Sequence, residues 1–364
     1  MRRFPAVLAG LLLVRALLGC DGAEPEPAAS APFAWAPVAP PADAPLALAL
    51  TATSDGTVYG IFAASGQLTL SAALYRRDGD GWTRAIEPPV DGGVQLAVGG
   101  LGGEVLASVY STSLSTQTYR VGASGLGSPV GYFPPVSIGD VTGLASDGGD
   151  VFLALTGIGE LLRSERGGAG DTWTRSPEVA GGVPSGPVTF VDARTVLMSV
   201  ASERANALAR WRLVRSEDAG ATWSEVLPET VGFYNVRTGP GGRLVAFSTE
   251  AAHASDDGGR TWAPVALPEP GRVIAAAAVT PAGYVVALVP LPSQAPTTDA
   301  NLFATADGGR MWAEARDGLP WPGGMARLNP WHPFEGHHRI VRAADGHVAL
   351  MAGGTIYRTT TPVL

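Results

Sequence analysis

The sequence alternates short apolar runs with turns rich in glycine, aspartate and proline along almost its whole length. The first clear unit has apolar runs at 46–53, 58–63 and 70–76, a Ser-Asp-Gly turn at 54–56, and a fourth run that begins at Trp82. Runs of four to eight residues bounded by such turns are typical of β-strands joined by hairpins. We therefore predict an all-β chain built from repeated units of four strands.

A second signal recurs near the end of each unit. Residues 216–223 read Ser-x-Asp-x-Gly-x-Thr-Trp, and residues 255–262 follow the same template. Residues 305–312 are a worn copy, 164–173 a lengthened one and 78–82 a shortened one. The template positions are Asp78, Trp82, Asp171, Trp173, Ser216, Asp218, Gly220, Thr222, Trp223, Ser255, Asp257, Gly259, Thr261, Trp262, Asp307, Gly309 and Trp312.

This template resembles the Asp-box (BNR repeat) of the β-propellers found in sialidases, sortilin-like domains and photosystem II assembly-factor-like proteins. The resemblance implies that each box forms the turn between the last two strands of a propeller blade. Its Asp is expected to accept hydrogen bonds from the backbone of its own loop, and its Gly to adopt a conformation that a side chain would oppose. Its Trp is expected to bury a large ring between blades. These residues are therefore predicted to be structural.

The spacing of the fourth-strand tryptophans predicts the number of blades. Trp82 and Trp173 are far enough apart for two units of about 45 residues, so a unit without a box is expected over 94–135. Residues 34–39 read almost like 261–266, the start of a fourth strand. This likeness places a fourth strand, without its box, at Trp35. We predict a single propeller of seven four-stranded blades, with the last blade closed by this N-terminal strand. Six or eight blades stay open, because blade two carries no box.

The N-terminus predicts export. Two arginines precede an apolar run at 4–18, as in a secretory signal, and the run ends at Gly19-Cys20, which resembles the bacterial lipobox. Cys20 is the single cysteine of the chain, so we predict its lipidation and a lipid-anchored protein on the periplasmic or cell-surface side of a bacterial membrane. The alternatives are a plain signal peptide with a chance Cys and an ordinary apolar N-terminus. The predicted divisions are 1–19 (signal peptide), 20–32 (Pro/Ala/acidic tether) and 33–364 (propeller).

Composition excludes several classes of function. The chain has a net charge of −8 and no basic block, so no electrostatic footprint for nucleic acid is present. One cysteine allows neither an intramolecular disulfide nor a cysteine cage for a metal. We expect no cofactor, no metal and a monomer whose partners are the lipid bilayer, through Cys20, and a protein or glycan.

Two long connections near the C-terminus carry the candidate ligand site, on the face expected to lie opposite the boxes. They span 290–301 and 317–339, and the second is rich in aromatic and imidazole side chains. A plug over the channel, a sugar or peptide site, and a metal site at its histidines are the three readings. Tyr234 and Arg243 flank strands that are expected to face the channel. The candidate residues of the second connection are Trp321, Arg327, Trp331, His332, Glu335, His337 and Arg339.

The set of active-site residues that a sialidase requires is incomplete in this sequence. A sialidase needs three arginines for the substrate carboxylate, a Tyr with a partner Glu, and an Asp as acid/base. The run 45–51 that opens blade one has no Arg, and Arg76 and Arg77 lie beside a box, on the rim away from the expected ligand. We therefore predict a non-catalytic binding or assembly module. The alternative is a sialidase-like exo-glycosidase that uses Tyr234.

Overall fold

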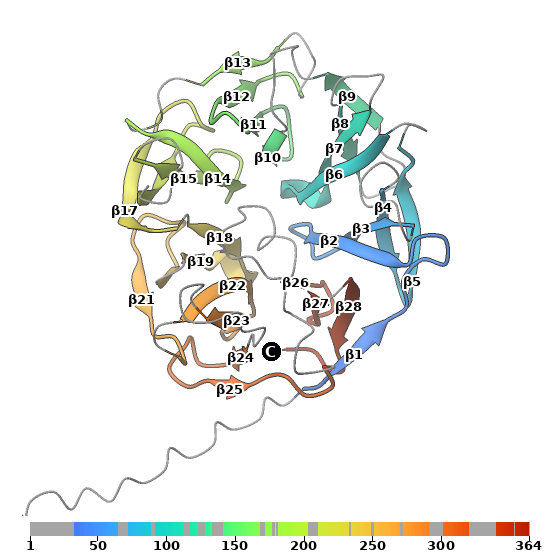
Figure 1. Cartoon of the computed structure of the whole chain (residues 1–364). Helices are drawn as coiled ribbons and strands as arrows, with labels where there is room; N and C mark the ends of the chain where they lie inside the picture. Colours follow the sequence, from blue (N-terminus) through green and yellow to red (C-terminus); the bar gives the residue numbers. More distant parts are fainter. Residues whose placement is uncertain are drawn as a thin grey trace, which may run out of the picture.

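Seven four-stranded antiparallel sheets stand in a ring around a central axis (Figure 1). In this computed structural model no helix among the described residues is long and apolar enough to cross a membrane. The structure describes residues 33–64, 72–88, 92–111, 117–122, 128–132, 141–167, 172–176, 179, 181–202, 210–232, 234–248, 251–269, 272–290, 301–319, 340–352 and 354–363.

Each blade is an up-and-down sheet whose first strand is innermost. Blade one holds β2 (Leu46–Ala52), β3 (Val58–Ala63), β4 (Ala73–Asp78) and β5 (Gly81–Ile86). Blade two holds β6 (Gly92–Gly99), η1 (Leu101–Gly103), β7 (Val105–Ser111), β8 (Gln117–Val121) and β9 (Ser128–Tyr132). Blade three holds β10 (Val141–Ser146), β11 (Phe152–Thr156), β12 (Leu161–Ser164) and β13 (Thr174–Arg175). Blade four holds β14 (Val183–Phe190), β15 (Val196–Ala201), β16 (Arg210–Ser216) and β17 (Ser224–Val231).

The remaining blades follow the same order until the last. Blade five holds β18 (Asn235–Thr238), η2 (Pro240–Gly242), β19 (Leu244–Phe247), β20 (Ala252–Ser255) and β21 (Ala263–Val265). Blade six holds β22 (Arg272–Val279), β23 (Tyr284–Pro290), β24 (Asn301–Thr305) and β25 (Ala313–Glu314). Blade seven holds β26 (Ile340–Arg342), β27 (Val348–Ala352), β28 (Thr355–Thr359) and β1 (Trp35–Val38).

The N-terminal strand closes the ring. β1 pairs with β28 from Trp35↔Thr359 to Val38↔Ile356, so the first and last strands of the chain lie side by side (Figure 1). This pairing confirms the predicted closure and the count of seven blades. The predicted unit without a box is blade two, whose fourth strand ends at Tyr132. Closure covers strand edges that would otherwise be free to pair with another chain.

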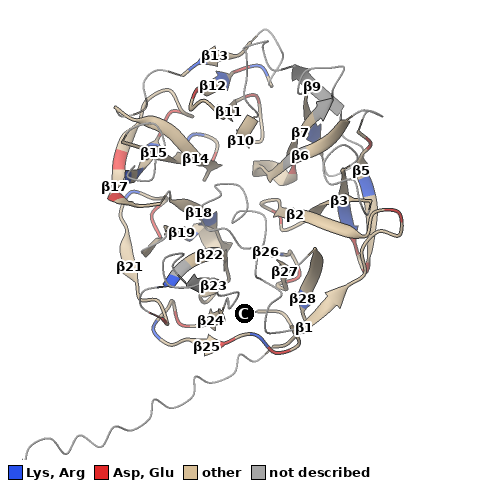
Figure 2. Ribbon diagram, in the orientation of Figure 1, with Lys and Arg blue, Asp and Glu red and all other residues tan. Residues whose placement is uncertain are grey.

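The hydrophobic core lies between the blades. Second strands such as β3 and β15 are buried at every position, because each blade packs against a neighbour on both faces. The buried residues form seven clusters, each shared by two adjacent blades. Charged residues are concentrated instead on the outer strands and turns (Figure 2).

Fourth-strand tryptophans fill these interfaces at six of the seven blades. Each ring packs into the cluster shared with the preceding blade: Trp223 contacts the cluster of blades three and four, and Trp312 that of blades five and six. Trp35 is 3% exposed, and its Nε1 donates to Ala315 O of blade six at 2.6 Å. The six are Trp35, Trp82, Trp173, Trp223, Trp262 and Trp312.

Candidate functional site

Three turns between third and fourth strands share one hydrogen-bond pattern, and we call them box loops (216–223, 255–262 and 305–312). In the first, Asp218 Oδ1 accepts the amide of Thr222 at 2.7 Å and Oδ2 accepts its hydroxyl at 2.6 Å. Ser216 Oγ accepts the amide of Gly220 at 2.8 Å and donates to Asp218. Partial burial acts against ionisation, but the bonds from Thr222 outweigh it and lower the pKa of Asp218 to about 2.

The other two box loops repeat this pattern with one difference. In the second, Asp257 Oδ2 accepts the hydroxyl of Thr261 at 2.6 Å, and the bonds from Thr261 lower the pKa of Asp257. In the third, Met311 stands where the other loops have Thr, so Asp307 receives its amide at 3.0 Å but no hydroxyl. In the first two loops both carboxylate oxygens of the Asp accept hydrogen bonds from their own loop, whereas in the third loop Oδ1 of Asp307 accepts them.

The box glycines bring each loop against the preceding blade. Gly220 has φ +90°, and a Cβ placed there would lie 3.1 Å from Leu153 of blade three. Gly259 has φ +80°, and its Cβ would lie 3.1 Å from Leu197 of blade four. Both values of φ are in the region that favours glycine. The box loops are therefore part of the packing between blades.

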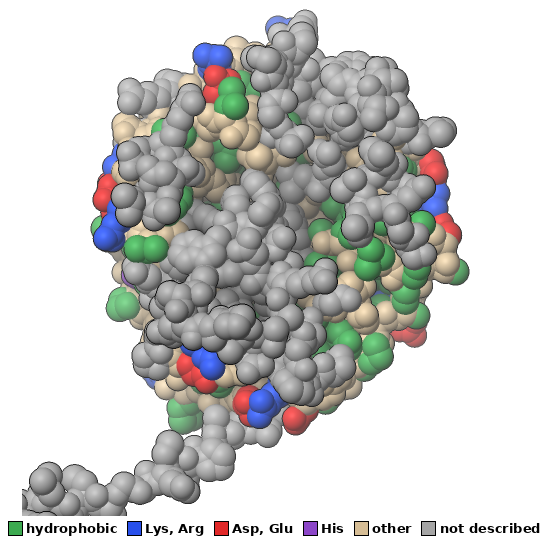
Figure 3. Space-filling model, in the orientation of Figure 1, with side chains coloured by type: hydrophobic (Ala, Val, Ile, Leu, Met, Phe, Trp, Pro, Cys, Tyr) green, Lys and Arg blue, Asp and Glu red, His purple; other side chains and the backbone are tan. Residues whose placement is uncertain are grey.

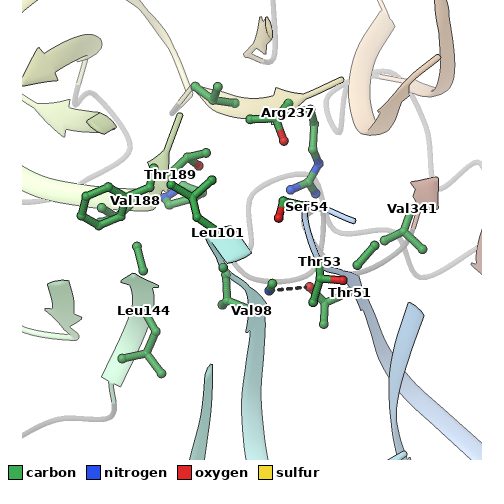
Figure 4. A pocket seen from close by; sticks show the side chains of 18 of the residues that line it. Thr51, Thr53, Ser54, Val98, Leu101, Leu144, Val188, Thr189, Arg237 and Val341 are labelled. Carbon is green, nitrogen blue, oxygen red and sulfur yellow. Dashed lines mark hydrogen bonds between the residues drawn. The ribbon is translucent and has the colours of Figure 1, made fainter. Parts of the chain in front are cut away.

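A pocket of about 190 Å³ lies on the ring axis, between the first strands of all seven blades (Figure 4). Most of its lining comes from the C-terminal ends of these strands, beside the turns that lead into the second strands. Consecutive antiparallel strands place these turns on the same face as the box loops. The pocket therefore lies toward the box-loop face.

Arg237 of β18 is the charged side chain that stands out in this pocket (Figure 4). Its side chain is half-buried, and the loss of surrounding water lowers the pKa of Arg237 to about 10. The guanidinium is therefore a cation at neutral pH. At the matching position of the other first strands, two residues before the amide that closes the turn, the residues are Thr51, Val98, Ala145, Thr189, Ala278 and Val341. None of these is charged.

Hydroxyl groups and a second arginine share the pocket. Ser54 and Thr189 line it together with Arg237, and Figure 4 shows Ser54 close to the guanidinium. Arg342 of β26 also lines it, and its Nε is buried with no hydrogen-bond partner in the described part of the chain. No Asp or Glu is among the lining residues that the structure describes. The pocket can therefore accept an anionic group in a chain whose net charge is negative.

The structure places two of the sequence candidates outside this pocket. Tyr234 is 2% exposed, and its hydroxyl donates to Pro228 O at 3.1 Å, so the side chain belongs to the blade interior. Arg243 lies beside β19 and pairs with Asp256 at 2.9 Å. Neither residue lines the pocket.

Other candidates lie outside the described residues, and their roles stay predictions: Cys20, Asp171, Trp321, Arg327, Trp331, His332, Glu335, His337 and Arg339. The same holds for a ligand site on the face opposite the box loops. Within the described ranges no group of three or more His, Cys, Asp or Glu side chains could hold a metal ion. Among the described residues, Figure 3 shows acidic and basic side chains at the outer edge of the face in view.

Sequence reasoning missed Arg237 and Arg342. Both lie in short first strands, Asn235–Thr238 and Ile340–Arg342, whose counterparts carry only small, apolar or hydroxyl side chains near the axis. An arginine in an innermost strand could therefore have indicated a site on the axis. That inference requires the strand order of each blade to be known first.

Comparison with known proteins supports the fold and leaves the family open. No family model and no curated protein matches the sequence. Among solved structures, YCF48 bound to D1 peptide is 15% identical with a TM-score of 0.57, covering 92% of this chain and 99% of its own. A streptogramin B lyase is 13% identical with a TM-score of 0.59, covering 90% and 97%. The GH74 xyloglucanase from Xanthomonas campestris is 17% identical with a TM-score of 0.54, and the match covers 90% of this chain but 53% of the enzyme. At these identities the likeness extends to the β-propeller fold alone.

Proposed function

We propose that this protein is a non-catalytic binding or assembly module that holds a carboxylate of a protein partner in the axial pocket. The observation that carries the proposal is Arg237, the one charged residue at its position among the seven first strands. We further propose that the module is of the Asp-box type and is exported and lipid-anchored through Cys20. The anchor rests on the sequence of the N-terminus.

The chemistry of Arg237 suits a carboxylate. A guanidinium presents a planar fork of donors that matches the two oxygens of a carboxylate, and such charge-assisted bonds are stronger than neutral ones. The attraction is greater beside protein than in bulk water, because the local dielectric constant is lower. Ser54 and Thr189 line the same pocket and can donate further hydrogen bonds.

A protein ligand is favoured over a glycan by the walls of the pocket. Sugar sites commonly offer an exposed aromatic ring, whereas the described lining has Phe190 as its aromatic residue, and Phe190 is 5% exposed. A propeller of similar fold has been solved with a peptide bound, as its name states. The described lining has no Tyr, Asp or Glu, so nothing in it favours the alternative of a sialidase-like glycosidase.

Calorimetric titration of the purified protein tests this proposal. The probe is acetyl-trialanine with a free terminal carboxylate, compared with the same peptide as its amide. The reference is the binding of the acid by the wild type. We expect the wild type to bind the amide about 10- to 100-fold more weakly, and the Arg237→Gln variant to bind either probe more weakly by the same factor. That range corresponds to about 1.5–3 kcal/mol for a hydrogen bond to a charged group. The affinity of Arg237→Lys for the acid should lie between those of the wild type and Arg237→Gln.

The control variant is Arg210→Gln, which removes an exposed charge from the third strand of blade four. It should leave the affinity unchanged. Equal binding of acid and amide, or no dependence on Arg237, would contradict the proposal. Preferential binding of 3′-sialyllactose over lactose and over the peptide would move the ligand class to glycans, and turnover of a fluorogenic sialoside would favour the enzyme alternative.

A further inference from the structure

In blades three and four, an arginine on the third strand holds the box loop of the next blade. Arg163 of β12 donates from Nε to Ala219 O of the first box loop at 3.0 Å. Arg215 of β16 does the same to Gly258 O of the second box loop at 2.9 Å. Each of these arginines directly precedes the Ser at the end of its strand. The matching residue of blade seven is Arg358, which precedes Thr359 in β28.

Blade one, the next blade after Arg358, has a shortened loop. Four residues, 78–81, separate Arg77 from Trp82, whereas six residues, 217–222, separate Ser216 from Trp223. Arg77 pairs directly with Trp82 in a tight hairpin. No hydrogen bond joins Arg358 to blade one among the described residues, and Arg358 pairs with Asp345 of its own blade instead.

The missing part of the loop leaves a cavity of about 230 Å³ between blades seven and one, which we call the seam pocket. Apolar side chains and Trp82 form much of its wall, and two guanidinium groups and a single carboxylate, Asp345, complete the charged part of the described lining. The residues used below are Val58, Arg77, Trp82, Ile356 and Arg358. The volume is below the range of about 300–1,000 Å³ that drug-sized ligands occupy. It fits a smaller group.

Arg77 occupies the place of the box serine and lacks a close partner. Its side chain is 15% exposed, and its Nη1 is buried without a hydrogen-bond partner. The nearest carboxylate in an ion pair is that of Asp80, 3.9 Å away and fully exposed. The guanidinium lies 5.5 Å from the centre of the Trp82 ring. The described lining holds two guanidinium groups, of Arg77 and Arg358, and one carboxylate, so the site carries an excess of positive charge. Burial and the nearby charge of Arg358 lower the pKa of Arg77.

We propose that the seam pocket binds a carboxylate carried on a short apolar group, with the carboxylate on Arg77 and the apolar part against Val58, Trp82 and Ile356. A bound carboxylate would satisfy the buried Nη1 and offset the repulsion between Arg77 and Arg358. The ligand thereby takes the space that a full box loop fills elsewhere in the ring. This site is separate from the axial pocket and does not depend on its function.

Two probes distinguish the possible sources of the carboxylate. Isovalerate represents a free small acid, with isovaleramide as its neutral control. Acetyl-Ala-Asp-Gly-amide represents an acidic residue of a partner peptide, with the Asn peptide as its control. Each is titrated into the ¹⁵N-labelled protein while the indole Nε1–H resonance of Trp82 is followed, assigned with Trp82→Phe. This group donates to Ala39 O at 3.1 Å, next to Val38, which lines the site.

We expect at least one carboxylate probe to shift the Trp82 resonance, and its neutral control to bind at least about tenfold more weakly. Arg77→Gln should weaken the carboxylate by a similar factor, while Arg310→Gln, the loss of an exposed box-loop charge in blade six, should not. Insertion of Gly-Gly after Gly79 should fill the pocket and abolish binding. Binding of the acid alone or the peptide alone supports the site and identifies the source.

The proposal is overturned if neither carboxylate shifts the resonance, or if acid and amide bind equally. It is also overturned if Arg77→Gln binds like the wild type, or if the Gly-Gly insertion retains wild-type affinity. Thermal unfolding of each variant verifies that it is folded, and the insertion provides a second route if Arg77→Gln is unstable.

Discussion

The third box loop predicts a stabilising substitution. In the other two loops a Thr hydroxyl donates to the box Asp at 2.6 Å, at Thr222 and at Thr261. Met311 occupies that position in the third loop and is 75% exposed, so it loses little apolar contact when it is replaced. We expect Met311→Thr to add the missing hydrogen bond to Asp307 and to raise the free energy of unfolding. Met311→Val is the matched control, because Val has the shape of Thr without its hydroxyl.

The magnitude follows from the exposure of the loop. A buried hydrogen bond to a charged group contributes about 1.5–3 kcal/mol, and solvent screening at this exposed carboxylate leaves only a small part of that. With an m-value of about 3 kcal/mol/M in urea, the midpoint of Met311→Thr should lie about 0.2–0.3 M above that of Met311→Val. Thr261→Val should lower the midpoint by a similar amount.

Acid supplies a second signature of the same bond. The pKa of Asp307 is lowered in the folded protein, chiefly by the amide of Met311. A carboxylate with a depressed folded pKa contributes stability above its unfolded pKa and loses it as the pH falls through the folded pKa. The difference between Met311→Thr and Met311→Val should therefore be full at pH 7 and decline below about pH 4. Equal urea midpoints for the two variants at pH 7 would refute the reasoning.

Three further outcomes follow. Trp35→Ala should lower the free energy of unfolding in urea by about 3–5 kcal/mol, because it leaves a cavity between blades six and seven and removes the donor to Ala315 O. A decrease below about 1 kcal/mol would contradict closure through this strand. The free energy of unfolding should fall as the pH drops from about 4 toward 2, since the pKa of Asp218 is about 2 when folded, and a flat profile would oppose this. Cys20→Ser should move the protein from the membrane fraction to the soluble fraction of an expressing bacterium, and retention in the membrane would exclude lipidation as the anchor.

The repeat made most of the fold predictable. Box tryptophans mark fourth strands at a nearly constant spacing, and the likeness of residues 34–39 to 261–266 was enough to place β1 in blade seven. The spacing is informative because each blade packs in the same way, with the tryptophan of its fourth strand buried against the preceding blade. Blade two was placed only by the length of chain available to it.

The two proposed sites were not predictable from local pattern. Arg237 resembles any strand arginine until the ring places β18 on the axis. Arg77 was set aside because it lies on the rim of the boxes, and its importance depends on Arg358 and on a loop that is shorter than its counterparts. Both sites arise from long-range neighbours, which the periodicity of a single sequence does not encode.

Photo-crosslinking in intact bacteria tests the axial binding site most directly. A photoreactive amino acid replaces Ser54, which lines the axial pocket, or Ser224, which is exposed on the fourth strand of blade four. The account predicts a specific crosslinked protein from position 54 and none from position 224, and loss of that product when Arg237→Gln is added. A product that forms only from position 224, or that persists in Arg237→Gln, would contradict it.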